Sequence, residues 1–206
     1  MVLTECRKLR VLDFDCECRP MAWYGGDWVT KQPTAIAWSF IGERSPVQVA
    51  VIGESFDTRR VLDEERSMLE RFVEAYDAAD IVTGHFIRGF DLPLVNGALM
   101  RLGMPGLNPK LAQDTKTDLV KAGGLSKSQE NLGAMFELKH PKVPMNTSRW
   151  MLANLLLPEG IEATKKRVVG DVRQHTELRA AMLKRGLLVA PKVWASGGGR
   201  AESYTP

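Results

Sequence analysis

Apolar residues fall at every second position, or in short runs, along much of the first quarter of the chain. This pattern is typical of β-strands and predicts three of them, over residues 7–14, 34–43 and 46–54. A Gly-containing turn separates the second and third runs, which together predict an antiparallel hairpin. We therefore expect three strands before any helix.

After residue 57 the apolar positions take up the spacing of a helix. Leu62, Leu69 and Phe72 would share one helical face, with acids and arginines on the other, which predicts a helix over residues 57–80. The elements expected after it are a strand at 81–83, a helix from 91, a strand from 111, and helices over 128–138, 147–157 and 163–185. Ser126 and Ser128 are candidate caps for the helix near 128.

This order of elements predicts an α/β fold whose mixed sheet has three antiparallel strands followed by parallel strands, with helices on its faces. We expect one domain over residues 1–190. The segment 191–206 is rich in Gly and Ser and predicts a flexible C-terminal tail.

The composition is that of an ordinary globular protein with a full core. Of the 206 residues, 44% are hydrophobic and 26% are charged. No apolar run has the length of a membrane span, and residues 1–10 lack the apolar centre of a signal peptide. Cys6, Cys16 and Cys18 fit neither a zinc knuckle nor an even disulfide framework. We therefore expect a cytoplasmic protein with reduced thiols and no membrane partner.

Charge is distributed unevenly along the chain. Residues 1–100 hold 11 basic and 16 acidic side chains, whereas residues 101–206 hold 17 basic and 9 acidic ones. An acidic half beside a basic half suits a metal-dependent enzyme that acts on a polyanion. Chance variation across a solvated surface explains the asymmetry equally well.

The first strand carries a cluster of acids at alternate positions, Asp13, Asp15 and Glu17. Alternate side chains of a strand project to one face, so these carboxylates would point together and repel one another. A hard divalent cation bound through carboxylate oxygens is the usual reason for such an arrangement. Asp13 could be a third ligand or a neighbour that tunes the site.

Two later acids could complete a metal centre. Asp91 follows a strand and a loop and stands at a helix start, where it could cap the helix, bind metal, or do both. Asp171 lies inside the last long helix, where a surface ion pair with its basic neighbours is the alternative. Two metal ions about 4 Å apart can hold the attacking and leaving oxygens of a phosphodiester, which requires several carboxylates.

Three segments, FDCE, GHFIRGFDLP and GDVRQHTELR, occur in that order and resemble the three exonuclease motifs of the DEDD (DnaQ-like) 3′–5′ exonucleases. The resemblance covers roughly residues 8–188 and implies a ribonuclease H-like fold. Its four acids match Asp15, Glu17, Asp91 and Asp171. In that family two Mg²⁺ or Mn²⁺ ions bind these acids, and a metal-activated water cleaves the terminal phosphodiester.

The chain departs from the family pattern at the water-activating position. Active members usually carry a Tyr four residues, or a His five residues, before the last Asp, and this chain has Arg167 and Lys166 there. His175 follows Asp171 by one helical turn and so lies on the same helical face, where it could assist catalysis or be a surface histidine.

Several other residues are candidates for nucleic-acid binding. They are His85, Lys142, Lys165, Lys166 and Arg167, for which local hydrogen bonding or solvated charge is the alternative. The aromatic side chains Trp23, Tyr24 and Trp28 could stack on bases or cover the core. Asp114 could be a strand-end acid near the site or a turn former.

The function expected from these features is two-metal 3′–5′ exonuclease activity that releases nucleoside monophosphates, with the 3′ end of single-stranded DNA as the leading substrate and RNA as the other. A polymerase, or another replication or repair protein, is an expected partner. The alternatives are a catalytically inactive nucleic-acid-binding module of the same fold, and an endonuclease of the ribonuclease H or resolvase type.

Overall fold

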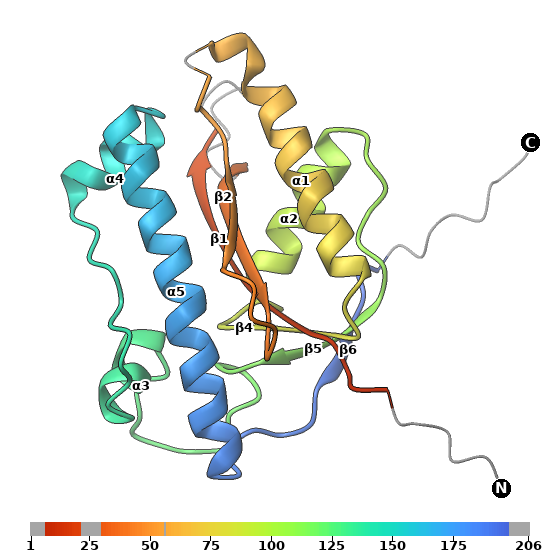
Figure 1. The fold of residues 1–206 in the computed structure, drawn as a ribbon, viewed down its shortest axis with the longest axis vertical. Coiled ribbons are helices and arrows are strands. Elements are labelled where there is room, and N and C mark those ends of the chain that lie inside the picture. The colour runs from red at the N-terminus through yellow and green to blue at the C-terminus, as the bar shows by residue number, and fades with distance from the viewer. Residues whose placement is uncertain (1–6, 22–29, 56, 198–206) are drawn as a thin grey trace, which may run out of the picture.

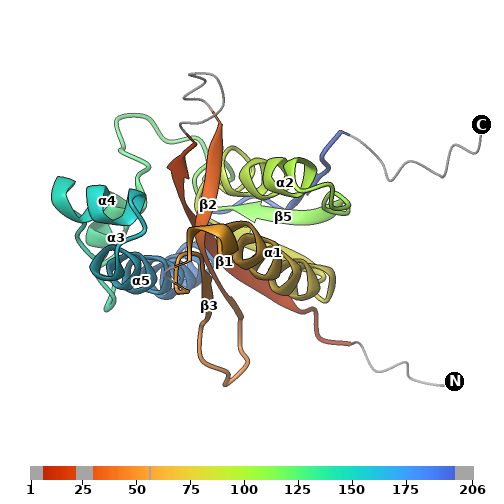
Figure 2. The same cartoon turned by 90° about the horizontal axis from the view of Figure 1, so that it is seen from above.

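The computed structural model describes residues 7–21, 30–55 and 57–197 and shows a mixed sheet between two layers of helices (Figure 1). Viewed from above, α1 and α2 cover one face, and α3, α4 and α5 lie on the other (Figure 2). The strands are β1 Val11–Pro20, β2 Lys31–Phe40, β3 Gln48–Val51, β4 Ile81–Gly84, β5 Lys110–Asp114 and β6 Lys192–Trp194. The helices are the 3₁₀-helix η1 Thr58–Arg60, then α1 Val61–Asp77, α2 Asp91–Arg101, α3 Gln129–Met135, α4 Thr147–Asn154 and α5 Pro158–Lys184.

The strands are ordered β3-β2-β1-β4-β5-β6. The pairs β1–β2 and β2–β3 are antiparallel, β1–β4 and β4–β5 are parallel, and β6 returns antiparallel to β5. The predicted fold class, a ribonuclease H-like mixed α/β sheet flanked by helices, is confirmed. Among the described residues, no helix is both long and apolar enough to cross a membrane.

Alternation along β1 separates its two faces. Leu12, Phe14 and Cys16 are buried in the main core, which is formed with α1 and α2. The ring of Phe14 lies 4.9 Å from that of Phe72 on α1. The other face of β1 carries Asp13 and the acids that follow it, and this face packs against α5. The same strand therefore supplies both core and site.

Three of the differences between the predicted and the observed bounds have a clear physical reason. The first strand runs to Pro20 because β2 pairs with it along its whole acidic half, up to Lys31 opposite Pro20. The last helix begins at Pro158, five residues before the expected start, because proline is favoured in the first helical turn. Residues 192–194, expected within the flexible tail, form β6 instead, where Val193 pairs with Leu111 of β5.

Candidate metal centre

The acids of β1 lie where the sheet opens. Strand β4 pairs with β1 only as far as Thr83 opposite Asp13, whereas β1 continues to Pro20. A side chain at Gly84 would come within 2.7 Å of the carbonyl oxygen of Phe14, so glycine there lets β4 end closely against β1. The edge of β1 beyond Asp13 is therefore free of β4.

Asp91 occupies that free edge. Its Oδ1 accepts a hydrogen bond from the backbone N–H of Cys16 at 2.9 Å, and the residue is 2% exposed. The expected capping role is wrong, because Asp91 is the first residue of α2, after the N-cap position of Phe90, and the helix has no side-chain cap. The carboxylate instead joins the start of α2 to β1, beside the acids.

Asp15, Glu17 and Asp171 converge from β1 and α5. One carboxylate oxygen from each lies within 4.8 Å of the others, which is a spacing that can hold a metal ion. Asp91 lies outside this group of three, although its charge acts on Asp15. The structure therefore brings three of the four predicted ligands together and places the fourth beside them.

Burial and mutual repulsion make these carboxyl groups hard to ionise. The pKa of Asp15 is raised well above its usual value, first by burial and then by the charges of Asp91, Glu17 and Asp171. Burial also raises the pKa of Glu17 to about 7 and that of Asp91 to about 7. Such a group of perturbed acids is typical of a site that binds a cation.

Two basic side chains enter the cluster. Arg167 Nε lies 2.8 Å from Asp171 Oδ2 and 3.6 Å from Glu17 Oε1, and Lys142 Nζ lies 3.8 Å from Asp171 Oδ2. Burial raises the pKa of Asp171, and Lys142 and Arg167 act against that rise. These two predicted nucleic-acid contacts therefore lie at the acids themselves.

Asp171 Oδ1 is buried and has no hydrogen-bond partner. A buried polar atom without a partner is costly, and coordination of a hard cation by a carboxylate oxygen removes that cost. The residues present therefore fit a hard divalent cation, because the donors are carboxylate oxygens from two rigid elements.

Asp13 and His175 form a separate, closed arrangement. Asp13 Oδ1 lies 2.6 Å from His175 Nδ1, and its Oδ2 accepts a hydrogen bond from Thr176 Oγ1 at 2.7 Å. His175 Nε2 lies 3.0 Å from Thr115 Oγ1. Both ring nitrogens thus have partners away from the acid cluster, and His175 bridges β1 to the segment after β5. We do not assign it to water activation.

His85 belongs to the same polar chain. Its Nδ1 lies 3.0 Å from Thr115 Oγ1, while its Nε2 is buried without a partner. Burial, followed by the nearby His175, lowers the pKa of His85 to about 4. The imidazole is therefore neutral at physiological pH and offers no charge to a phosphate.

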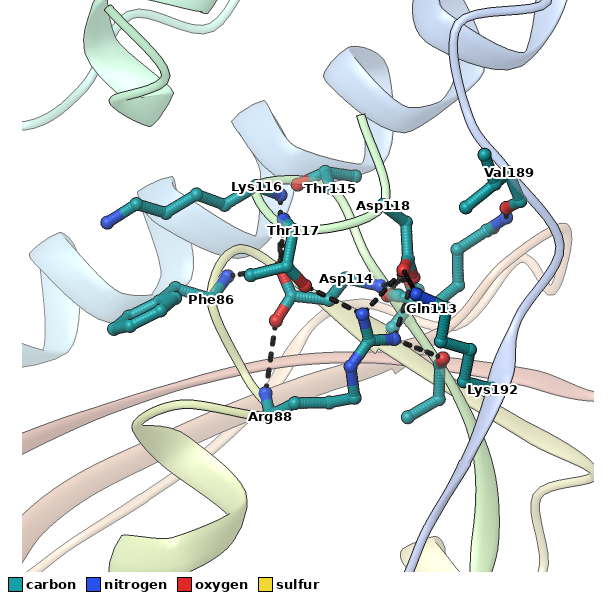
Figure 3. A network of polar contacts seen from close by, with 12 residues as sticks. Phe86, Arg88, Gln113, Asp114, Thr115, Lys116, Thr117, Asp118, Val189 and Lys192 are labelled. Carbon is teal, nitrogen blue, oxygen red and sulfur yellow. Dashed lines mark hydrogen bonds and ion pairs between the residues drawn. The ribbon is translucent and has the colours of Figure 1, made fainter. Parts of the chain in front are cut away.

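The loop between β4 and α2 is fixed by two acids, Asp114 at the end of β5 and Asp118 just after it (Figure 3). Asp114 accepts hydrogen bonds from the backbone N–H groups of Phe86 and Arg88, at 3.0 and 3.1 Å. The Arg88 guanidinium in turn donates to Asp118 at 2.7 Å and to the Ala112 carbonyl at 2.9 Å. Asp114 thus fixes the loop that leads into Asp91. Sequence reasoning missed Arg88 and Asp118, because their pairing spans 30 residues.

The remaining predicted residues lie further out. Lys165 pairs with Glu54 and Glu162 at the surface. Lys165 and Lys166 line a groove of about 560 Å³ between α5 and the segment around His140. The aromatic residues 23, 24 and 28 lie outside the described residues. Sequence reasoning also missed Thr176, although it lies inside the third motif-like segment, and Thr115, because their contacts with Asp13, His85 and His175 join segments far apart in the chain.

The comparisons with known proteins support the fold. No family model and no curated protein matches the chain. Among solved structures, it is similar to the family B DNA polymerase from the hyperthermophilic archaeon Pyrobaculum calidifontis, with a TM-score of 0.58 and 21% sequence identity. The match covers 86% of this chain and 25% of the polymerase chain. The chain thus corresponds to about a quarter of that polymerase's length.

Proposed function

We propose that this protein is a metal-dependent 3′–5′ exonuclease that releases nucleoside monophosphates from single-stranded DNA. The observation that carries the proposal is the convergence of Asp15, Glu17 and Asp171 from β1 and α5, with the buried, unpartnered Asp171 Oδ1 among them. The similarity of fold to about a quarter of a DNA polymerase adds support, because a small nuclease domain beside a polymerising one would show this relation.

Asp15, Glu17, Asp91 and Asp171 would hold two Mg²⁺ or Mn²⁺ ions. When bound, such ions supply a water of lowered pKa and charge stabilisation for the attacking and leaving oxygens. The chain supplies the rigid placement of these acids. Asp91 is held by the Cys16 amide, and Asp171 by the packing of α5 on β1.

The substrate strand would lie along the basic groove beside the acids. Lys165 and Lys166 line this groove together with Pro141 and Val143, and Lys142, the residue between those two in the chain, has its Nζ 3.8 Å from Asp171 Oδ2. Phosphate contacts of this kind position a strand without reading its sequence. We therefore propose sequence-independent binding of single strands, with a polymerase or another replication or repair protein as the partner that delivers them.

One observation favours a second candidate, an inactive binding module of the same fold. Arg167 stands where active members of the resembled family carry a Tyr, and it contacts two of the acids. No side chain among the described residues takes the place of that general base next to Asp171. A bound water would then have to lose its proton to solvent or to one of the raised-pKa carboxylates.

Digestion of 5′-labelled single strands of DNA and RNA separates these candidates. We expect a ladder of shortened DNA products with Mn²⁺, none with chelator, and none from the Asp15→Ala variant, whose fold is checked by circular dichroism. Binding without shortening in every metal condition would identify the inactive module. Cleavage of a circular single strand would identify an endonuclease, because an exonuclease has no end from which to start.

A further inference from the structure

Two cations in the acid cluster contact carboxylates that a metal ion would need. Arg167 contacts both Glu17 and Asp171, and Lys142 approaches the same oxygen of Asp171 as Arg167 does. The side chains of Arg167 and Lys142 are 14% and 24% exposed, so both charges are largely withdrawn from water. The negative charge of Glu17 and Asp171 is therefore already neutralised in part, by Arg167 and Lys142, before a metal ion binds.

The segment that carries Lys142 is fastened to α5 on both sides of that residue. On one side, Glu177 accepts a hydrogen bond from the Lys139 amide at 2.9 Å, and its Oε1 lies 2.8 Å from His140 Nδ1. On the other, Arg167 donates to the Val143 carbonyl. Arg167 thus contacts the acids and the 139–143 segment at once. A metal ion that displaced Arg167 from the acids would therefore also affect its contact with this segment.

Close packing at Gly170 holds Val143 next to this contact. A side chain at position 170 would come within 2.7 Å of Val143 Cγ2, so glycine allows the segment to lie against the helix beside Asp171. The approach of Lys142 to Asp171 therefore depends on backbone packing as well as on charge.

Arg167 only partly satisfies the Asp171 carboxylate in the place of a metal ion. Although Nε lies 2.8 Å from Oδ2, Arg167 Nε and Asp171 Oδ1 are both buried without a hydrogen-bond partner. A buried ion pair compensates for lost hydration only when its hydrogen bonds are also formed. A hard divalent cation offers these oxygens a stronger partner than the guanidinium does.

The number of acids relative to cations also favours binding of a divalent ion. The four acids Asp15, Glu17, Asp91 and Asp171 outnumber the two cations near them. When all four acids are ionised, two negative charges exceed those that Arg167 and Lys142 neutralise, and a divalent ion matches that excess.

We propose that Arg167, assisted by Lys142, is an exchangeable counter-cation. It neutralises Glu17 and Asp171 in the metal-free protein and leaves them when a divalent ion binds. This inference rests on the proposed function, because the ion is the one that function requires. It assigns a role to the residue that stands at the general-base position: it sets the metal affinity.

The test is Mn²⁺ affinity, measured from the electron paramagnetic resonance signal of free Mn²⁺. Arg167→Met keeps much of the apolar length of the side chain and removes the charge, and it should bind Mn²⁺ roughly tenfold more tightly, which is about 1.4 kcal/mol. Lys142→Met should change affinity in the same direction but less, because its Nζ lies 3.8 Å from Asp171. Lys184→Met, at an exposed position near the end of the same helix, is the matched control and should leave Mn²⁺ affinity unchanged.

Thermal unfolding gives a second reading. In chelator, Arg167→Met should melt below the wild type because the acids lose their nearest cation, and Mn²⁺ should raise its Tm by more than it raises that of the wild type. If Arg167→Met does not fold in chelator, Lys142→Met serves for both comparisons.

The outcomes separate this inference from the proposed function. Equal or weaker Mn²⁺ binding by Arg167→Met, with binding by the wild type, would overturn the exchange and leave the exonuclease proposal standing. Binding by Arg167→Met and not by the wild type would support the exchange in its strongest form. Absence of Mn²⁺ binding in every variant would overturn both.

Discussion

Two contacts that involve acids lie next to one another between β1 and α5. In only one of them does every carboxylate oxygen have a hydrogen-bonding partner. Asp13 meets His175 and Thr176, and each of its carboxylate oxygens has a short hydrogen-bonding partner. Further along β1 and one turn earlier on α5, Asp15 faces Asp171, an arrangement that leaves Asp171 Oδ1 without a partner.

The difference between the two contacts distinguishes a structural carboxylate from a candidate ligand on the same strand and helix. Strand, helix and residue chemistry are alike at the two contacts, so burial of a carboxylate alone does not mark a site. The distinguishing features are several acids within reach of one another, raised pKa values and unpartnered atoms. We therefore propose that Asp13 contributes to stability and Asp15 to the chemistry of the site.

Substitutions at Asp13 and Asp15 should differ most in their effect on activity. Asp15→Asn should lower the rate of Mn²⁺-dependent digestion by more than about 10²-fold, the scale seen when a preorganised charge-stabilising group is removed. Asp13→Asn should retain digestion, once the rate is normalised to folded protein. The measurement is the initial rate of shortening of a 5′-labelled single strand. Equal losses in the two variants would contradict the assignment.

Stability should show the opposite order. Asp13→Ala leaves His175 and Thr176 without their buried acceptor and should lower the free energy of unfolding by about 1–3 kcal/mol for each group left without a partner. Asp15→Ala should cost less in chelator, because it also relieves repulsion among Asp15, Glu17 and Asp91. Urea unfolding of both variants in chelator makes the comparison, and a larger loss for Asp15→Ala would reverse our interpretation.

The pH dependence of stability should report the raised pKa values. Glu17 and Asp91 have pKa values of about 7 in the folded protein, well above their ordinary values. Between about pH 4 and pH 7 these groups hold protons when folded and lose them on unfolding, so the free energy of unfolding in chelator falls as pH rises through that window.

Metal binding should move in the other direction. Mn²⁺ needs deprotonated carboxylates, so its affinity should rise with pH across the same window. The contribution of Glu17 to the pH dependence of stability is measured by comparing the wild type with Glu17→Gln in chelator. The variant lacks one of the titrating groups, so its free energy of unfolding should decline less as pH rises. A decline of equal size in the two proteins would show that Glu17 is not responsible.

A smaller effect is expected from the loop that leads to Asp91. Asp114→Ala removes the acceptor of the Phe86 and Arg88 amides and should cost about 1–3 kcal/mol of stability. Faster hydrogen exchange at these two amides, measured by mass spectrometry or NMR, should accompany the loss. Unchanged exchange there would mean that the Arg88 pair with Asp118 fixes the loop alone.

The smallest effect is expected in the basic groove. Substituting Lys165 and Lys166 with alanine should weaken oligonucleotide binding in Ca²⁺ and reduce the slope of log affinity against log salt by roughly 0.7 for each phosphate that the protein no longer neutralises. Fluorescence anisotropy at several salt concentrations measures both quantities. An unchanged slope would exclude the groove from the strand's path.

The fold class and the acids on β1 were within reach of the sequence, because both depend on local periodicity. Alternation placed Asp13, Asp15 and Glu17 on one face of a strand, as observed. The sequence could not rank Asp13 against Asp15, because the distinction lies in which α5 residue each acid meets. That choice depends on how the helix packs.

Contacts between distant segments account for the other differences. Asp91 looked like a helix cap, yet its carboxylate meets the Cys16 amide across 75 residues. Arg167 and Lys142 looked like phosphate contacts, and their position at the acids follows from the fastening of segment 139–143 to α5. Strand β6 was missed because Lys192–Trp194 is short and is defined by its pairing with β5.

The most direct test of the central claim is the anomalous diffraction signal of Mn²⁺ in crystals of the protein. We predict a peak bounded by Asp15, Glu17 and Asp171, with Arg167 withdrawn from Asp171 and with Asp13 still paired to His175. A structure from crystals in saturating Mn²⁺ that shows no peak at these acids, or a peak at Asp13 instead, would contradict the assignment of this cluster as the metal centre.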